Sequence, residues 1–208
     1  QDGTIKKTSL EAYSRPRQNG INAITIREGD RLLDVALTNG NNQIVIATNT
    51  GRSVRFEETR VRPMGRTAAG VKGIWIDAKI PTEKVIGMVC VSDPTVQQLL
   101  VVSEKGFGKR SEVDAYRLTN RGGKGVKALN ITEKTGALVA IKEVDDNDDL
   151  MIITKAGILI RSSVAELRVM GRNTQGVKLI RLKNESDEIS SVTKIEKEPE
   201  PEEVELVE

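Results

Sequence analysis

The sequence predicts an all-β protein in which repeats of about 50 residues form propeller-like blades of four strands each. The main observation is a pair of glycine landmarks that recur together. The turn glycines are Gly3, Gly51, Gly106 and Gly157, and the second glycines are Gly20, Gly70, Gly125 and Gly176. Successive spacings are 48, 55 and 51 residues for the first set and 50, 55 and 51 for the second. In addition, no ten-residue stretch has the apolar period of a helix.

The second, third and fourth repeats each begin with a continuous apolar run that leads to the turn glycine. Such short runs are typical of strands buried on both faces. The runs are 44–47, 99–102 and 150–153. Each is followed by a two-residue turn whose second member is the turn glycine, because glycine adopts positive φ without steric cost.

Two further strands follow in each unit. An alternating strand comes after the second glycine, as in 71–74 and 177–180. A fourth strand is expected at 32–37, 85–91, 138–141 and 189–193. The segment 163–167 is expected to form a single helical turn.

These strands divide the chain into repeats and a tail. The predicted blades are 1–41, 42–95, 96–147 and 148–195, and the first is partial because no strand precedes Gln1. Gln1 is not an initiator methionine, so we expect a fragment of a longer chain with more blades upstream. The tail, 196–208, carries seven acidic residues and one Lys and is expected to be flexible. Residues 1–195 then carry 31 basic and 23 acidic residues, which favours a polyanionic partner.

The composition excludes several kinds of site. The chain has no His, so imidazole catalysis and His-ligated metals are excluded. The single Cys90 excludes an intramolecular disulfide and a multi-cysteine zinc site. No stretch is long and apolar enough to span a membrane. No catalytic residue, metal or cofactor is therefore expected in this chain.

Lys and Arg recur at equivalent repeat positions and form the candidate binding site. Equivalent positions on successive blades produce arcs of positive charge, which suit the phosphates of a bent DNA duplex. Four residues after the turn glycines stand Lys7, Arg55, Arg110 and Arg161. Two residues after the second glycines stand Lys72, Lys127 and Lys178. The loops before the second glycines add Arg15, Arg17, Arg62, Arg66, Arg117, Arg121, Lys124, Arg168 and Arg172. Because such columns read phosphates rather than bases, binding is predicted to be independent of sequence.

Several segments resemble the C-terminal domain of the DNA gyrase A subunit. They include the loop Met-Gly-Arg-Asn-Thr-Gln-Gly-Val at 170–177, the stretch 54–56 with 62–65, and Gly-Phe-Gly-Lys-Arg at 106–110. The resemblance covers nearly all of residues 1–195. It implies a β-pinwheel, a propeller relative whose blades exchange strands, which wraps DNA around a basic rim and directs strand passage toward negative supercoiling.

The resemblance also implies a wider setting. The partners would be double-stranded DNA, the remainder of the gyrase A subunit and, through it, the gyrase B subunit, in the bacterial cytoplasm at the nucleoid. ATP and Mg²⁺ would be used by the rest of this type II topoisomerase. The family box Gln-Arg-Arg-Gly-Gly-Lys-Gly has only a partial match here, Asn-Arg-Gly-Gly-Lys-Gly at 120–125. The homologous domain of topoisomerase IV, which favours decatenation, therefore stays open, as does a protein-binding scaffold.

Other conspicuous residues are interpreted as structural. Tyr13 and Tyr116 occupy similar repeat positions and are expected to anchor loops rather than cut DNA. The acidic run 145–149 lacks the glycine and glutamate of a calcium loop and is expected to be an inter-blade turn. Trp75 is expected to pack. The tail is expected to compete with DNA for the basic rim.

Overall fold

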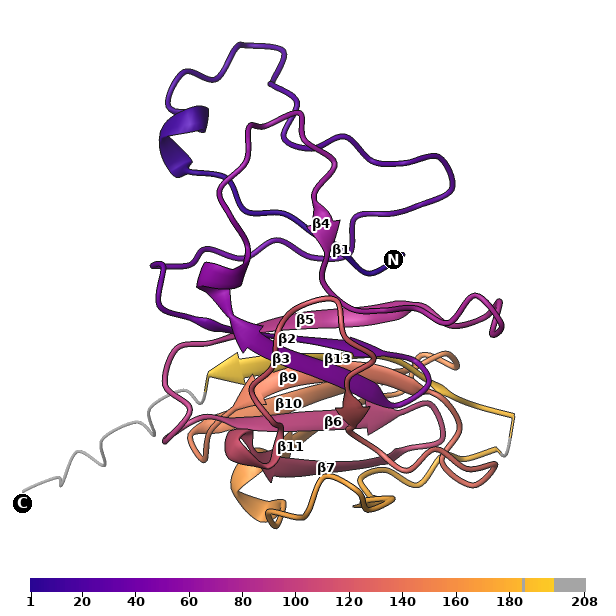
Figure 1. The fold of residues 1–208 in the computed structure, drawn as a ribbon. Coiled ribbons are helices and arrows are strands. Elements are labelled where there is room, and N and C mark those ends of the chain that lie inside the picture. The colour runs from indigo at the N-terminus through magenta and orange to yellow at the C-terminus, as the bar shows by residue number, and fades with distance from the viewer. Residues whose placement is uncertain (185, 197–208) are drawn as a thin grey trace, which may run out of the picture.

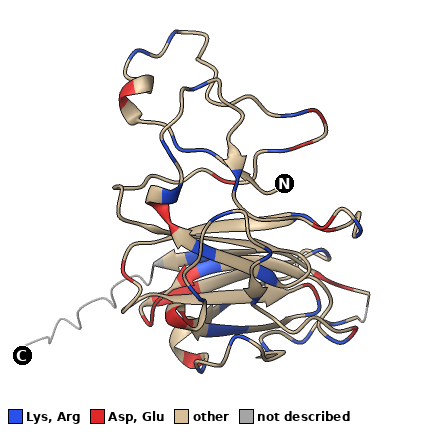
Figure 2. Cartoon of the chain, in the orientation of Figure 1, with Lys and Arg blue, Asp and Glu red and all other residues tan. Residues whose placement is uncertain are grey.

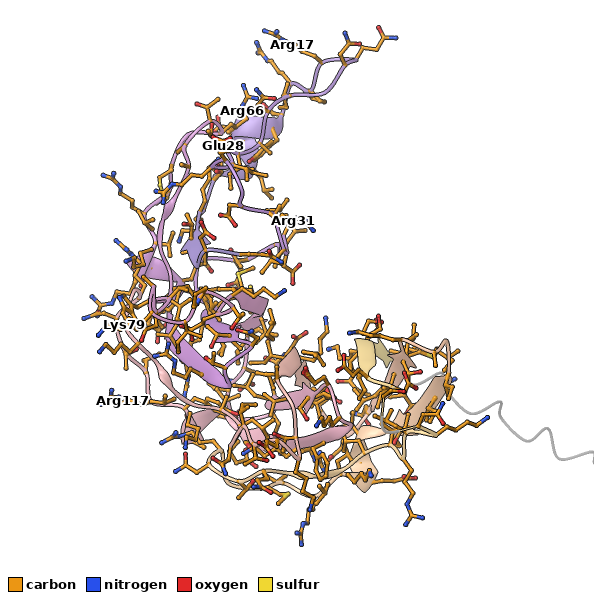
Figure 3. All side chains as sticks on the ribbon, turned by 90° about the vertical axis from the view of Figure 1, so that its right-hand side faces the viewer. Arg17, Glu28, Arg31, Arg66, Lys79 and Arg117 are labelled. Carbon is orange, nitrogen blue, oxygen red and sulfur yellow. The ribbon has the colours of Figure 1, made fainter. Side chains whose placement is uncertain are left out.

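A computed structural model of the chain describes residues 1–184 and 186–196. The predicted tail lies outside the described residues, except that the backbone of Glu196 ends the last strand. The four repeats follow one another along an arc, with Arg17 at its far tip (Figure 3). Strands and short 3-10 turns make up the regular structure, so the predicted all-β class is confirmed. No helix in the described part is long and apolar enough to cross a bilayer.

The second and third repeats form four-stranded antiparallel sheets with the same order (Figure 1). The sheet of the second repeat has the order β5-β2-β3-β8, and that of the third has β9-β6-β7-β12. The strands of the second repeat's sheet are β2 (Gln43–Thr48), β3 (Arg52–Glu57), β5 (Val85–Val91) and β8 (Val126–Lys127). Those of the third repeat's sheet are β6 (Gln98–Ser103), β7 (Phe107–Glu112), β9 (Leu138–Val144) and β12 (Val177–Lys178).

The outer strand of each sheet comes from the following repeat. β8 belongs to the third repeat but pairs with β3, with Lys127 opposite Arg52. β12 belongs to the fourth repeat but pairs with β7, with Lys178 opposite Phe107. β4 (Val71–Lys72) pairs in the same way with β1 (Thr4–Ile5) of the first repeat. Neighbouring repeats therefore exchange strands, as the resemblance implied.

The exchanged strands are shorter than predicted, at two residues each. After β4, the amides of Gly73 and Ile74 both donate to the carbonyl of the turn glycine Gly3 (2.7 and 3.2 Å). Ala128 and Leu129 do the same to Gly51 (2.7 and 3.3 Å). Because consecutive amides converge on one carbonyl, the alternating ladder stops there.

The first and last repeats depart from the four-stranded plan. The fourth repeat forms the sheet β13-β10-β11. Its strands are β10 (Asp148–Thr154), β11 (Leu159–Ser163) and β13 (Ile189–Glu196). The strand predicted at 32–37 is wrong. Its equivalents β5, β9 and β13 each pair with the apolar strand before a turn glycine, whereas 32–37 pairs with none of the described residues. Val35 and Leu37 are accordingly 75% and 78% exposed.

Short 3-10 turns end the basic strand of each repeat. They are η1 (Leu10–Tyr13), η2 (Glu58–Arg60), η3 (Val113–Ala115) and η4 (Val164–Glu166). The single turn predicted at 163–167 is therefore confirmed. Residues 145–147 form the turn between β9 and β10, which belong to successive sheets, so the predicted inter-blade turn is confirmed there, whereas 148–149 begin β10.

The apolar core lies between successive sheets. One buried cluster joins Val45 and Val91 of one sheet to Leu99 and Ile141 of the next and includes Tyr116. A second cluster joins Leu100 and Val102 to Leu150 and Ile152. Removing such apolar surface from water contributes about 25 cal/mol per Å², so the arc is held by face-to-face packing as well as by exchanged strands.

The second glycines allow close contact between repeats. Gly125 has φ +74°, and a Cβ there would lie 2.3 Å from the Ser53 carbonyl oxygen. Gly20 has a similar φ, +77°, but no atom lies within 4 Å of its Cβ position.

Gly125→Ala is expected to lower the free energy of unfolding by about 2–4 kcal/mol, which combines left-handed strain with overpacking. The matched Gly20→Ala is expected to cost about 1–2 kcal/mol, from backbone strain alone. Urea denaturation of both variants measures this difference. Equal losses would mean that the approach of Gly125 to β3 is not required.

Candidate nucleic-acid interface

The lysines of the exchanged strands, here called the outer lysines, lie on the outer edge of successive sheets. Lys72, Lys127 and Lys178 each end a two-residue strand and are exposed. Each is placed by pairing with the preceding repeat, so the repeat-to-repeat spacing of the sheets sets the spacing of the charges. Figure 2 shows Lys and Arg in every repeat along the arc.

A second exposed set, the turn-following arginines, stands two residues after the 3-10 turns η2, η3 and η4. Arg62, Arg117 and Arg168 are exposed. The residue after each of these arginines forms a parallel β-bridge to the preceding repeat. The backbone amide of the next residue then donates to a backbone carbonyl of that repeat, at 2.8–2.9 Å: Met64 to Lys7, Thr119 to Arg55 and Met170 to Arg110. Arg117 projects from the convex side of the arc, as does Lys79, whereas Arg31 lies on the concave side (Figure 3).

The structure gives Arg55 and Arg110 a different role from the predicted phosphate contact. Arg55 is 6% exposed, and its Nη1 donates to the carbonyls of Val113 (2.8 Å) and Tyr116 (2.9 Å) in the following repeat. Arg110 is 7% exposed, and its Nε donates to the Leu167 carbonyl of the following repeat. Both guanidiniums are enclosed by protein acceptors, so they join repeats instead of facing solvent.

The remaining members of that column behave similarly where the structure describes a following repeat. Lys7 donates to the Glu58 carbonyl at 3.2 Å and pairs with its carboxylate at 3.2 Å. Arg161 belongs to the last repeat; its side chain is 48% exposed and pairs with Asp149 at 2.8 Å.

The arginines four residues before the second glycines, here called the loop arginines, point back to the preceding repeat. Arg66 Nη1 donates to the Asn22 carbonyl (3.1 Å), Arg121 Nη1 to that of Lys72 (3.0 Å) and Arg172 Nη1 to that of Lys127 (2.8 Å). All three are half-buried. In the first repeat, Arg15 and Arg17 are exposed in the loop that precedes Gly20.

Lys124, in the partial box, lies over an aromatic ring. Its Nζ is 4.9 Å from the centre of the Trp75 ring, and the Arg52 guanidinium is 5.6 Å from it. The Trp75 amide donates to the Gly123 carbonyl at 2.9 Å. Trp75 thus packs the box loop against the preceding repeat and attracts two cations to its face. Lys178 is likewise 5.9 Å from the Phe107 ring.

Sequence reasoning missed one buried cation, Lys109. Its side chain has no exposed surface, and Nζ donates to the carbonyls of Gly171 (2.7 Å) and Thr174 (3.1 Å) and to the Thr174 hydroxyl (3.2 Å). Burial, with a smaller contribution from the charge of Arg172, lowers the pKa of Lys109 to about 8. The neighbouring Phe107, Gly108 and Ser111 are the sequence signal that could have indicated a strand buried on both faces.

The predicted residues therefore fall into two groups. The exposed group, which can reach a ligand, contains Arg15, Arg17, Arg62, Lys72, Arg117, Lys124, Lys127, Arg161, Arg168 and Lys178. The inter-repeat group contains Lys7, Arg55, Arg66, Arg110, Arg121 and Arg172. A repeated row of exposed cations suits binding of an extended polyanion. Within the described part of the chain, no group of three or more acidic or cysteine side chains could hold a metal ion.

Comparison with known proteins settles the family of this arrangement. The family model for the DNA gyrase C-terminal domain, beta-propeller, matches residues 1–39, 42–92, 97–145 and 148–196. The chain belongs to this family. It is 44% identical over 200 residues to the DNA gyrase A subunit of Staphylococcus aureus strain COL, a match that covers 96% of this chain and 22% of that protein. The gyrase A subunit from strain MW2 of the same species gives the same values. The chain thus spans about a fifth of these relatives.

Two solved structures share the fold. The C-terminal domain of DNA topoisomerase IV aligns with a TM-score of 0.85 and 23% identity, over 94% of this chain and 59% of that chain. The DNA gyrase A C-terminal domain aligns with a TM-score of 0.80 and 21% identity, over 93% and 62%. Both likenesses establish the architecture of this gyrase-family chain.

Arg55→Ala is expected to destabilise the protein by about 2–5 kcal/mol, because the buried carbonyls of Val113 and Tyr116 lose their donor. The exposed Arg62→Ala is expected to change stability by less than about 0.5 kcal/mol. Chemical denaturation of both variants measures the contrast. A small loss for Arg55→Ala would return that residue to the exposed group.

The lowered pKa of Lys109 predicts a specific pH dependence. Between pH 8 and 10.5 the unfolded chain holds a proton on this lysine that the folded chain has lost. The contribution of Lys109 therefore makes the free energy of unfolding increase as the pH rises. The slope approaches at most about 1.4 kcal/mol per pH unit.

The comparison is the wild-type chain against Lys109→Met over this pH window. Burial raises the pKa of Cys90 to about 11, which acts in the opposite direction above pH 9, but this thiol is common to both proteins and cancels in the difference. A stability difference that does not change with pH would show that Lys109 keeps an ordinary pKa.

Proposed function

We propose that this chain binds and wraps duplex DNA around its basic convex side, without reading base sequence, and so directs strand passage by a DNA gyrase toward negative supercoiling. The observation that carries the proposal is the repetition of exposed outer lysines on successive exchanged strands. Cations repeated along an arc can follow a curved phosphate backbone, whereas a flat patch can meet it only locally. Membership of the gyrase C-terminal domain family supports the same assignment.

Bending DNA has an energetic cost that the contacts must offset. A bend of 40–90° over 20–30 base pairs costs about 1–6 kcal/mol. Single exposed lysines contribute little, so the cost is distributed over many phosphate contacts along the arc. The interface predicted here consists of side chains aimed at phosphates, which explains why no base preference is expected.

The proposed setting is a gyrase of a bacterial cytoplasm, at the nucleoid. The remainder of the gyrase A subunit and the gyrase B subunit would be the protein partners, and the chemistry that uses ATP and Mg²⁺ would reside in them. This chain would supply no catalytic residue. Identity of 44% to gyrase A subunits favours gyrase over topoisomerase IV. The partial box at 120–125 is the feature that favours topoisomerase IV.

Affinity for a duplex of about 40 base pairs is expected to fall roughly 10³–10⁵-fold between 50 and 200 mM salt, as for six to ten phosphate contacts. Ligation of nicked circles in the presence of the chain is expected to shift the linking number, with a sign that reports the handedness of the wrap. Weak binding that hardly depends on salt would reject the proposal in favour of a protein-binding scaffold.

Two exposed arginines on opposite sides of the arc provide a matched pair (Figure 3). Arg117→Ala, on the convex side, is expected to reduce the slope of log affinity against log salt by about 0.9, the value for one lost phosphate contact. Arg31→Ala removes the same charge from the concave side and is expected to leave the slope nearly unchanged. Equal effects would mean that DNA does not follow the convex side.

A further inference from the structure

The three loop arginines make the same contact at every junction between repeats. In each case Nη1 donates to the carbonyl of the residue two places after the second glycine of the preceding repeat, at 2.8–3.1 Å. That residue is Asn22 at the first junction, Lys72 at the second and Lys127 at the third. Two of the three acceptors are therefore the backbone carbonyls of outer lysines.

Two loop arginines make a second contact with the preceding repeat. Arg121 Nε donates to the Arg60 carbonyl (3.0 Å), and Arg172 Nε donates to the Ala115 carbonyl (2.9 Å). Arg60 and Ala115 end the 3-10 turns η2 and η3, two residues before the turn-following arginines Arg62 and Arg117. One guanidinium thus holds the backbone beside both exposed rows of the preceding repeat.

The geometry of the junctions makes this contact consequential. The exchanged strands are two residues long, so ladder pairing supplies few hydrogen bonds there, and the remaining junction contacts are turn-glycine hydrogen bonds and apolar packing. A guanidinium is planar and holds its N–H donors in a fixed fork, so two bonded carbonyls define a direction as well as a distance. The carbonyls also occupy donors that a phosphate would otherwise use.

We infer that Arg66, Arg121 and Arg172 are positioning residues, which fix the angle between successive repeats and thereby the curvature of bound DNA, and do not act as phosphate ligands. This inference rests on the proposed DNA wrapping. Lysine can replace arginine at a phosphate, because both carry the required charge, but an ammonium cannot reproduce the planar bridge between two carbonyls. Substitution by lysine therefore separates the two roles.

The test compares the double variant Arg121→Lys/Arg172→Lys with the control Arg27→Lys/Arg31→Lys, which changes two exposed arginines that the proposed interface does not include. For the positioning role, the first variant keeps the wild-type salt slope for a duplex of about 40 base pairs, but its linking-number change per bound chain falls to roughly half or less. Energy transfer between dyes at the two DNA ends falls in parallel, measured at saturating protein. The control variant keeps wild-type values in all three measurements.

Glutamine substitutions supply the opposing result. If Arg172 binds phosphate, Arg172→Gln lowers the salt slope by about 0.9, as Arg168→Gln does, and Arg172→Lys restores both slope and linking number. That pattern overturns the inference. If the wild-type chain wraps DNA and the lysine variant wraps it equally well, the inference is overturned but the proposed function stands. A wild-type chain that does not bind DNA rejects the proposed function as well.

Folding of the variants is checked independently. Amide hydrogen exchange in the DNA-free chain is expected to rise at Lys127–Leu129 in Arg172→Lys and to stay unchanged in Arg168→Lys. If the double variant does not fold, Arg66→Lys replaces it, since Arg66 has one carbonyl contact of this kind and its loss is milder. For this variant, the linking-number change per bound chain is expected to fall by a smaller amount, at an unchanged salt slope. A linking-number change equal to that of the wild-type chain overturns the inference.

Discussion

The close approach of the turn glycines Gly3, Gly51 and Gly106 to the next repeat is the contact on which the rest of the structure depends. A Cβ at Gly3, Gly51 or Gly106 would lie 2.7–2.8 Å from the carbonyl oxygen of Ile74, Leu129 or Ile180, respectively. The glycine carbonyl in turn accepts amides from the same segments. Because a side chain at the turn would push this segment away, glycine is what lets a strand leave its own repeat and complete the preceding sheet. The outer lysines stand on the edge strands of the sheets only because of this exchange.

Strand exchange also explains why arginine and lysine divide between two roles. At each junction carbonyls at the ends of 3-10 turns and short strands lack ladder partners, and a buried carbonyl without a donor costs about 1–3 kcal/mol. Arg55 reaches forward to Val113 and Tyr116, and Arg121 reaches back to Arg60 and Lys72. The planar fork of arginine suits such paired acceptors, whereas the single ammonium of an outer lysine suits a mobile contact with an exposed phosphate.

Sequence periodicity is sufficient to predict the fold and part of the candidate site. Glycine spacing places the hairpins, and the lysines after the second glycines are exposed as predicted. Equivalent position does not reveal which way a side chain points, so periodicity alone groups Arg55 and Arg110 with the exposed residues. The strands that carry them are buried on both faces, and alternation therefore gives no signal. The segment 32–37 has a strand-like sequence but no pairing partner among the described residues. Pairing depends on residues distant in the chain, so the local sequence pattern could not predict it.

The partial box acquires a structural meaning when the repeats are compared. Lys6 and Lys109 stand three residues after their turn glycines and donate to loop carbonyls of the following repeat, Arg66 and Gly171. The second repeat has Val54 at this position, so the loop that follows it receives no such donor. In that loop the Gly122 amide donates to the Gly73 carbonyl at 2.5 Å, and Gly122 has φ +78°. Gly122 and Gly123 therefore hold this loop through backbone hydrogen bonds, whereas Lys6 and Lys109 hold the corresponding loops of the other two junctions. The adjacent Lys124 is exposed and lies over Trp75.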